Sequence, residues 1–222
     1  MPVRVVPDGP VTRAEAAELL RGGSIVAVPT DTVYGIAAAM ELPDAIERLF
    51  AAKGRPPEKA VAVLLADADQ AWTLGVPTAA AHALAARFWP GGLTLVLPVR
   101  DGVVLPRVLA AGAPTIGVRV PDHEAPRALA RMLGPLPTTS ANKSGDADAR
   151  DAAQIAAELG DAIALVLDGG PIRGGPASTV VDCTLAWPSI LREGAISSAD
   201  IAAALADAGL AHAIGVWDVD EA

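Results

Sequence analysis

Residues 24–35 read Ser-Ile-Val-Ala-Val-Pro-Thr-Asp-Thr-Val-Tyr-Gly, and this stretch indicates both the class of fold and the place to look for a site. Its first five residues make a short apolar run that is typical of a buried strand, and Pro29 ends that run. Hydrogen-bonding side chains then follow at Thr30, Asp31, Thr32 and Tyr34. Loops at the ends of buried strands often carry binding sites, so we predict a small pocket for a polar metabolite. A polar strand edge with Tyr34 half-buried would give the same pattern.

Similar apolar runs alternate with Ala-rich stretches along the rest of the chain. The runs that predict strands are residues 3–6, 24–28, 60–65, 93–97, 115–120, 136–139, 163–167, 178–182 and 189–192. The stretches that predict helices are residues 12–21, 44–52, 78–88, 123–133, 151–159 and 199–208, with Thr12 and Ser198 as N-caps. Because several strands follow one another after residue 160, the pattern predicts an α/β fold with a mixed sheet and helices on its faces.

The length of 222 residues suggests one large domain, at about 150 residues per domain. We expect a single domain over residues 1–210 and a short C-terminal tail over residues 211–222. The N-terminus lacks the apolar core of a signal peptide, and the apolar stretches are too short to cross a membrane, so we expect a cytoplasmic protein with no membrane contact. The single cysteine, Cys183, excludes a disulfide within the chain and is expected to be a small core residue.

The chain is acidic, with 17 Lys and Arg against 26 Asp and Glu, and this argues against a surface that coats nucleic acid by charge. Against that background one segment is basic. Four cations fall within twelve residues, at Arg48, Lys53, Arg55 and Lys59. A guanidinium fork beside lysine ammonium groups suits a polyphosphate. A solvated basic turn paired with surface carboxylates is an equally open interpretation.

A second polar segment, Thr-Thr-Ser-Ala-Asn-Lys-Ser-Gly at residues 138–145, follows a predicted strand. Its Ser140 and Asn142 could bind a ligand, or they could close a turn or cap a helix. All three lysines of the chain fall in this segment or the basic one, at Lys53, Lys59 and Lys143. The three histidines lack the spacing of metal ligands, so no metal site built from protein alone is expected.

Seven motifs occur in order along the chain. They are Pro-Thr-Asp-Thr-Val-Tyr-Gly at 29–35, Lys-x-Arg-Pro at 53–56, Phe-Trp-Pro-Gly-x-Leu-Thr at 88–94, Gly-Val-Arg-Val-Pro at 117–121, Thr-Ser-Ala-Asn-x-Ser-Gly at 139–145, Ser-Thr-Val-Val-Asp at 178–182 and Leu-Arg-x-Gly at 191–194. Together, over roughly residues 12–205, the chain resembles the YrdC/TsaC-type threonylcarbamoyl-AMP synthases.

This resemblance implies a YrdC-like fold, a twisted mixed α/β sheet with a large concave cavity. It implies that L-threonine, bicarbonate and ATP, with Mg²⁺ on the nucleotide, give L-threonylcarbamoyladenylate and pyrophosphate. A separate transferase complex would then pass the threonylcarbamoyl group to adenosine 37 of tRNA.

The resemblance also implies roles for particular residues. The catalytic signature would be Lys53, Arg55, Ser140 and Asn142. The ATP-binding residues would be Lys53, Arg55, Lys59, Thr115, Ser140, Ala141, Asn142 and Arg192. The threonine-binding residues would be Thr32, Tyr34, Arg119, Thr139 and Ser178.

The chain departs from the family pattern at one wall of the expected pocket. Many members have Pro-Leu after the basic loop and a histidine shortly after it, where this chain has Ala60-Val61 and Leu64. It also resembles the short members, which lack a further C-terminal domain. Three alternatives stay open at this point: a module of the same fold that binds tRNA or double-stranded RNA weakly, a carbamoyl-adenylate-forming relative, and a regulatory nucleotide-binding protein without turnover.

Overall fold

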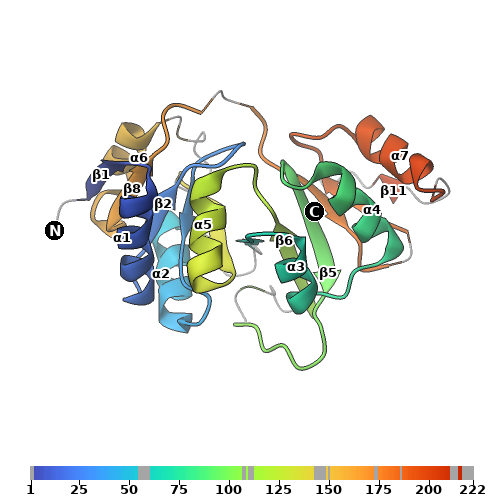
Figure 1. The fold of residues 1–222 in the computed structure, drawn as a ribbon, viewed down its shortest axis with the longest axis horizontal. Helices are drawn as coiled ribbons and strands as arrows, with labels where there is room; N and C mark the ends of the chain where they lie inside the picture. Colours follow the sequence, from blue (N-terminus) through green and yellow to red (C-terminus); the bar gives the residue numbers. More distant parts are fainter. Residues whose placement is uncertain are drawn as a thin grey trace.

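The computed structural model describes residues 3–54, 61–106, 109, 113–142, 149, 151–172, 175–185, 187–210 and 215–216. These residues form one sheet of eleven strands in the order β1-β8-β2-β3-β7-β4-β6-β5-β9-β10-β11, flanked by helices (Figure 1). The strands are β1 (Arg4–Pro7), β2 (Val26–Val28), β3 (Gly35–Ala37), β4 (Ala62–Leu64), β5 (Leu93–Pro98), β6 (Thr115–Arg119), β7 (Leu136–Ser140), β8 (Leu165–Asp168), β9 (Thr179–Asp182), β10 (Ser189–Arg192) and β11 (Gly215–Val216). The helices are α1 (Pro10–Arg21), α2 (Pro43–Lys53), α3 (Ala68–Leu74), α4 (Ala79–Phe88), α5 (Glu124–Leu133), α6 (Ala152–Leu159), the short 3₁₀ helix η1 (Gly160–Ala162) and α7 (Ser198–Asp207).

The sheet is mixed, which confirms the prediction from the run of late strands. Antiparallel neighbours include β3 with β7, β7 with β4 and β6 with β5. Parallel neighbours include β1 with β8, β4 with β6 and β5 with β9.

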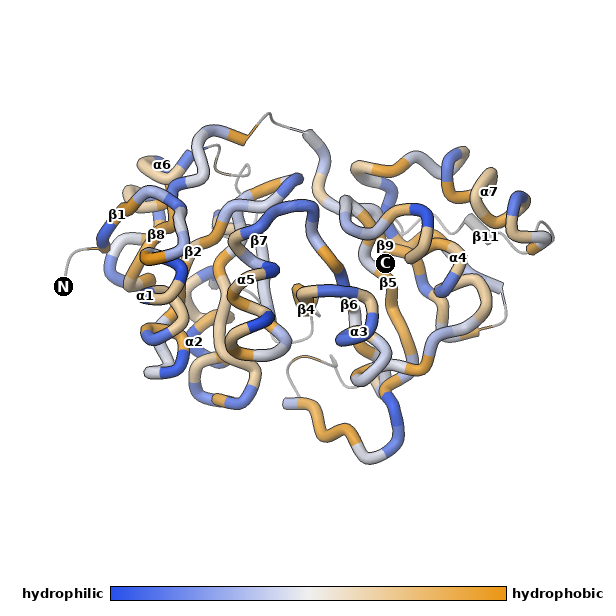
Figure 2. The backbone as a smooth tube through the Cα atoms, in the orientation of Figure 1, coloured by the Kyte–Doolittle hydropathy of each residue, from blue (hydrophilic) through white to orange (hydrophobic). Residues whose placement is uncertain are grey.

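One face of the sheet is covered along its length by helices. At the β8–β2–β3 end, Ala27, Ile36 and Val166 pack with apolar residues of α2 and α6. Toward the other end, Leu95 and Val118 pack with residues of α3, α4 and α7. The strands that carry these side chains, β5 among them, are largely hydrophobic (Figure 2). Burial of this apolar surface is the main term that stabilises the domain.

Among the described residues, helices cover the opposite face from β8 and β2 as far as β7 and the end of β4, where Leu136 and Leu64 pack against α5. At the β8–β2 end, α1 and α5 pack on Val26, Val28 and Leu167. Farther along, the cross-strand partners on this face are small or polar, as in Ala62 beside both Thr138 and Gly117. Small side chains with no helix above them leave a hollow, and this hollow is the candidate site described below.

The helix boundaries correct two predicted caps. Helix α1 begins at Pro10 with Gly9 as its N-cap, because proline fits the first helical position, where the N–H has no helical partner. Thr12 lies inside that helix and donates to the carbonyls of Pro7 and Gly9. Helix α7 is capped by Ser197, one residue before the predicted cap, and Ser197 accepts from the N–H of Asp200.

Two further predictions bear on the core and on the C-terminal segment. Cys183 is buried in the core, and burial raises the pKa of its thiol to about 12, as expected of a packing residue rather than a nucleophile. Strand β11 falls within residues 211–222 and pairs with β10, while the other residues of that segment lie outside the described ones. The domain boundary at residue 210 stays a prediction. Within the described part of the chain, no helix is long and apolar enough to span a bilayer.

Candidate functional site

A cavity of about 240 Å³ lies over the uncovered part of the sheet. Seven neighbouring strands, from β3 to β10 in the order of the sheet, contribute to its lining, largely through cross-strand partners on one face, and connecting loops contribute the rest. The lining residues are Thr30, Val33, Gly35, Val61, Ala62, Leu64, Thr94, Val96, Leu109, Thr115, Gly117, Arg119, Thr138, Thr139, Ser140, Ala177, Ser178, Val180 and Arg192. The lining thus combines small apolar side chains with hydroxyl and guanidinium groups, and converging polar groups in a concave site are what fix the orientation of a small ligand.

At one end of the cavity lies the ammonium of Lys53, in the last turn of α2. Its side chain is only 5% exposed. The ammonium donates to the carbonyl and the hydroxyl of Ser140, at 2.9 and 2.6 Å, and to Oδ1 of Asn142 at 2.8 Å. Ser140 also donates to Asn142, at 2.6 Å. The structure thus brings Lys53 together with Ser140 and Asn142, two other residues of the predicted catalytic signature that lie almost ninety positions later in the sequence.

This arrangement depends on the close approach of β3 and β7. Gly35 pairs with Ser140, and a Cβ at position 35 would lie 2.6 Å from the methyl group of Thr138. The N–H of Ala141 donates to the carbonyl of Tyr34 at 2.8 Å, which holds the turn after β7 in place. At the other side, Gly54 ends α2 in the left-handed conformation with φ of 62°, which favours glycine.

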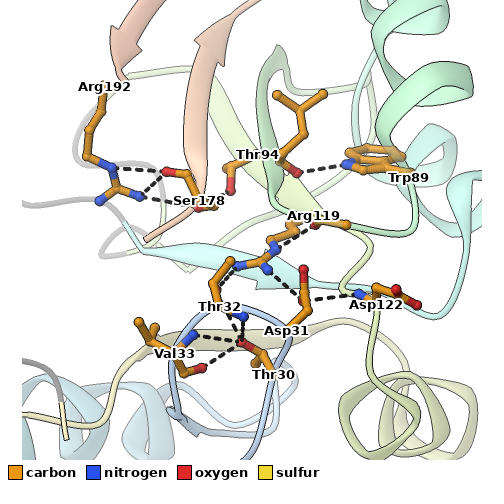
Figure 3. Close-up of polar contacts among 12 residues, drawn as sticks. Thr30, Asp31, Thr32, Val33, Trp89, Thr94, Arg119, Asp122, Ser178 and Arg192 are labelled. Carbon is orange, nitrogen blue, oxygen red and sulfur yellow. Dashed lines mark hydrogen bonds and ion pairs between the residues drawn. The ribbon is translucent and has the colours of Figure 1, made fainter. Parts of the chain in front are cut away.

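Arg119 lies at the opposite side of the cavity and is held by two loops, the one between β2 and β3 and the one between α4 and β5 (Figure 3). Its Nε donates to the carbonyl of Gly91 at 3.0 Å, Nη1 to Oγ1 of Thr32 at 2.9 Å, and Nη2 to Oδ1 of Asp31 at 2.7 Å. Burial lowers the pKa of Arg119 from its ordinary value, and the carboxylate of Asp31 opposes that effect. The charge of Arg192 lowers this pKa further.

Arg192 is therefore a second guanidinium close enough to Arg119 to repel it. Its Nη2 donates to the carbonyl of Ser178 at 2.7 Å and approaches the hydroxyl of Ser178 at 3.2 Å. That hydroxyl lies 2.9 Å from Oγ1 of Thr94 (Figure 3). Two like charges held close together in a partly desolvated cavity favour an anionic ligand.

Most of the predicted site residues that the structure describes gather at this cavity. Thr115, Arg119, Thr139, Ser140, Ser178 and Arg192 line it. Lys53 and Asn142 reach it through Ser140, and Thr32 contacts Arg119. The buried Ala141 follows Ser140 in the turn after β7. Arg55 and Lys59, the two cations of the basic segment that share the predicted ATP-binding role of Lys53, lie outside the described residues.

Tyr34 is the one described site residue whose side chain the structure turns away from the cavity. Its hydroxyl donates to the carbonyl of Gly170 at 2.7 Å and accepts from the N–H of Gly169 at 3.1 Å. Burial raises the pKa of this phenol to about 12, although the hydrogen bond from Gly169 opposes the shift. The contacts give Tyr34 a structural role, because it fastens the segment after β8 to the turn before β3.

The residue roles assigned from the sequence did not include Thr94, Thr30 or Asp31, which lie in or beside the cavity. Thr94 faces the cavity from a strand whose flanking residues, Leu93 and Leu95, are buried in the core. A single polar residue between two apolar residues of a predicted strand was the signal in the sequence that could have identified Thr94. Asp31 accepts a hydrogen bond from Arg119, and Thr30 contacts Arg119 through Thr32. Their position in the polar run after β2 was the signal available in the sequence. Leu64 lines the cavity, so the departure from the family pattern does fall on its wall.

Comparison with known proteins identifies the family of this chain. A family model named Sua5/YciO/YrdC, with the description "Telomere recombination", matches residues 18–194. The chain belongs to the Sua5/YciO/YrdC family. The resemblance seen in the seven motifs is thereby confirmed.

Members of the Sua5/YciO/YrdC family are similar in sequence and in structure. A Bacillus subtilis protein named threonylcarbamoyl-AMP synthase is 42% identical over 86% of this chain and 56% of its own length. The crystal structure of Pyrococcus abyssi Sua5 complexed with L-threonine superposes with a TM-score of 0.85 at 35% identity, covering 96% of this chain and 62% of that one. Escherichia coli YciO superposes with a TM-score of 0.80 at 27% identity, covering 90% of this chain and 98% of that one. The chain thus spans less than two thirds of the Bacillus and Pyrococcus proteins.

Proposed function

We propose that this chain is a threonylcarbamoyl-AMP synthase that makes L-threonylcarbamoyladenylate and pyrophosphate from L-threonine, bicarbonate and ATP. The observation that carries the proposal is the joining of Lys53, Ser140 and Asn142 at one side of a cavity whose other side holds Arg119 and Arg192. Three cations at one cavity of an acidic chain suit a reaction between anionic substrates. The similarity to proteins that bear this name supports the same reaction.

The two ends of the cavity would bind different substrates. Arg119 would hold the α-carboxylate of L-threonine, because a guanidinium fork matches a carboxylate in two parallel hydrogen bonds. Lys53, together with Arg55 and Lys59, would hold the triphosphate. Arg192 and Thr115 would contact the nucleotide between these ends. The complex of Pyrococcus abyssi Sua5 with L-threonine supports threonine as the amino acid.

The chemistry would proceed in two steps without a covalent enzyme intermediate. The deprotonated amine of threonine attacks the bicarbonate carbon. A C–N bond forms and water leaves, giving an N-carboxylate. An oxygen of that carboxylate attacks the α-phosphorus of ATP, and the bond to pyrophosphate breaks. The second step brings two anions together, so the cations of the cavity would act by positioning and by offsetting their repulsion.

The expected Mg²⁺ fits this site as a companion of ATP. Among the described residues no group of three or more histidine, cysteine, aspartate or glutamate side chains could hold a metal ion. The polar side chains that line the described cavity carry hydroxyl and guanidinium groups, and the Lys53 ammonium and the Asn142 amide lie beside Ser140, whereas Mg²⁺ prefers carboxylate and phosphate oxygens. When bound with ATP, Mg²⁺ would neutralise charge on the triphosphate oxygens.

The product is a reactive adenylate, so a later group transfer must consume it. We propose a separate transferase complex that acts on tRNA as that consumer. Direct contact with tRNA or double-stranded RNA stays a weaker proposal, because the net charge of −9 opposes binding that rests on phosphates.

The test is pyrophosphate release from ATP and bicarbonate with and without L-threonine. Threonine-dependent release supports the proposal. Release with carbamoyl phosphate in place of threonine and bicarbonate would instead favour a carbamoyl-adenylate-forming enzyme. Absence of turnover, combined with tight and steeply salt-dependent RNA binding, would favour an RNA-binding module.

A further inference from the structure

The guanidinium of Arg119, which we propose to bind the substrate carboxylate, already makes hydrogen bonds to the protein through all three of its nitrogens. A guanidinium has five N–H donors. Three of them are directed to Gly91, Thr32 and Asp31, all described residues of loops at the cavity rim. Contacts with the described residues leave two N–H groups, one on each terminal nitrogen. A carboxylate can accept from donors on two nitrogens of one guanidinium.

The direction of the hydrogen bonds behind Arg119 follows from counting protons. Thr30 and Thr32 have their hydroxyl oxygens 3.2 Å apart, and geometry alone leaves the donor undecided. Thr30, however, directs its single hydroxyl proton to the carbonyl of Val33, at 2.6 Å. Thr32 must therefore donate to Thr30, and its oxygen accepts from Arg119 (Figure 3). The hydroxyl proton of Thr32 consequently points toward Thr30.

Thr30 is well suited to fix this direction, because its oxygen also accepts from two backbone groups. The N–H groups of Thr32 and Val33 donate to it at 3.1 and 3.2 Å. The whole turn after β2 is thereby organised around the hydroxyl of Thr30, which is only 7% exposed.

Asp31 contributes both position and charge. Its Oδ1 accepts from Arg119 and also from the N–H of Asp122, at 3.1 Å, which ties the carboxylate to the segment before α5. Its negative charge compensates a guanidinium that burial and the neighbouring Arg192 both disfavour. Asp31 is absent from the residues that line the cavity.

We infer that Thr30 and Asp31 are positioning residues that hold Arg119 in the single orientation in which its two remaining N–H groups face the substrate carboxylate. This inference rests on the proposed function, since it takes L-threonine as the carboxylate that Arg119 binds. Neither residue needs to contact the substrate. Both set the affinity for threonine through Arg119, and both leave the nucleotide end of the cavity unaffected.

The test measures the KM for L-threonine and the KM for ATP in variants of each residue. Asp31→Asn keeps the shape and removes the charge, so the KM for L-threonine should rise about tenfold or more while the KM for ATP stays within about twofold. Thr30→Val removes the hydroxyl and should act in the same direction. Thr30→Ser restores the hydroxyl and should restore the KM. Should Asp31→Asn fail to fold, the Thr30 pair still decides the question.

A matched control comes from an ion pair that does not line the cavity. Asp8 accepts two hydrogen bonds from Arg13, at 2.8 and 2.6 Å, and both side chains are about as buried as Asp31 and Arg119. Asp8→Asn should lower the temperature of unfolding without changing the KM for L-threonine. If Asp8→Asn and Asp31→Asn change this KM equally, the positioning role is wrong.

A double-mutant cycle separates positioning from general stability. The dissociation constant of L-threonine is measured by calorimetry for wild type, Asp31→Asn, Arg119→Lys and the double variant. If Asp31 acts through Arg119, its substitution should have less than about a twofold effect once Arg119 is replaced. Independent, additive effects would overturn the inference. Failure of the wild type itself to bind L-threonine or to release pyrophosphate would instead overturn the proposed function.

Discussion

The ammonium of Lys53 lies 2.6 Å from the hydroxyl and 2.9 Å from the carbonyl oxygen of Ser140, so the end of α2 and the end of β7 meet at one charged group. A buried ammonium is costly unless oxygen atoms surround it, and here backbone, hydroxyl and amide oxygens do so. The charge is thus held at the cavity in advance of any ligand. Such preorganised charge is effective in stabilising a transition state.

Replacing Lys53 should abolish turnover while the fold survives. In Lys53→Ala, pyrophosphate release should fall by about a hundredfold or more, because a charge that stabilises the transition state is lost. Arg48→Ala is the matched control on the same helix. Arg48 donates to the carbonyl of Gly23, outside the residues that line the cavity, so its loss should leave the rate nearly unchanged. Equal rates in Lys53→Ala and wild type would contradict the assignment.

Removing the hydroxyl of Tyr34 should affect stability rather than threonine binding. Tyr34→Phe removes the hydrogen bonds to the N–H of Gly169 and the carbonyl of Gly170, at a cost of about 0.5–1.5 kcal/mol for each bond in the free energy of unfolding. The KM for L-threonine should stay within about twofold, since a contact that is not made to the substrate is not lost. Chemical denaturation and steady-state kinetics check the two parts. A large change in KM with unchanged stability would restore Tyr34 to the threonine-binding residues.

The raised pKa of Tyr34 predicts a loss of stability at high pH. The phenol has a pKa of about 12 when folded, against about 10 for an unfolded chain, so the folded state holds this proton more tightly. Its contribution is fully present below about pH 10 and is lost as the pH rises toward 12. Because Tyr34 is the only tyrosine, the ultraviolet absorbance of its phenolate reports it alone. A native midpoint near that of the unfolded chain would contradict the burial argument.

Adding a methyl group at Gly35 should weaken the pairing that positions Ser140. In Gly35→Ala the new Cβ would meet the methyl of Thr138 at 2.6 Å, and such overpacking costs about 1–3 kcal/mol of unfolding free energy. The compensating change is Thr138→Ser, which removes that methyl and keeps the hydroxyl bonded to Leu136. The double variant should recover part of the lost stability in thermal denaturation. No difference between the single and double variants would show that the two side chains do not meet.

The secondary structure was largely predictable from the sequence, because long apolar runs and helical periodicity are local signals. Helix α2, Pro43–Lys53, agrees with the helix predicted over residues 44–52, and its Ala45, Ile46 and Leu49 are buried. Strand β3 was missed because its residues, Gly-Ile-Ala, are small and give no β-branched run. Helix α3 was missed because seven residues are too few to show a period.

The members of the site were predictable mainly through the family motifs, whereas its geometry was not. The hollow arises from cross-strand register, as in Leu64 beside Arg119 and Gly117 beside Val96. Such pairing joins residues far apart in the chain and leaves no local trace in the sequence. The turning of Tyr34 away from the cavity likewise depends on Gly169 and Gly170, which lie more than a hundred residues away.

The most direct measurement of the central claim follows the carbon of labelled bicarbonate. The protein is incubated with ATP, Mg²⁺ and isotopically labelled bicarbonate, with or without L-threonine. The nucleotide products are separated and identified by mass spectrometry. We expect a labelled threonylcarbamoyl adenylate, formed in equal amount to pyrophosphate and only when L-threonine is present. Pyrophosphate release that does not depend on threonine, or an adenylate that carries no label, would contradict the account.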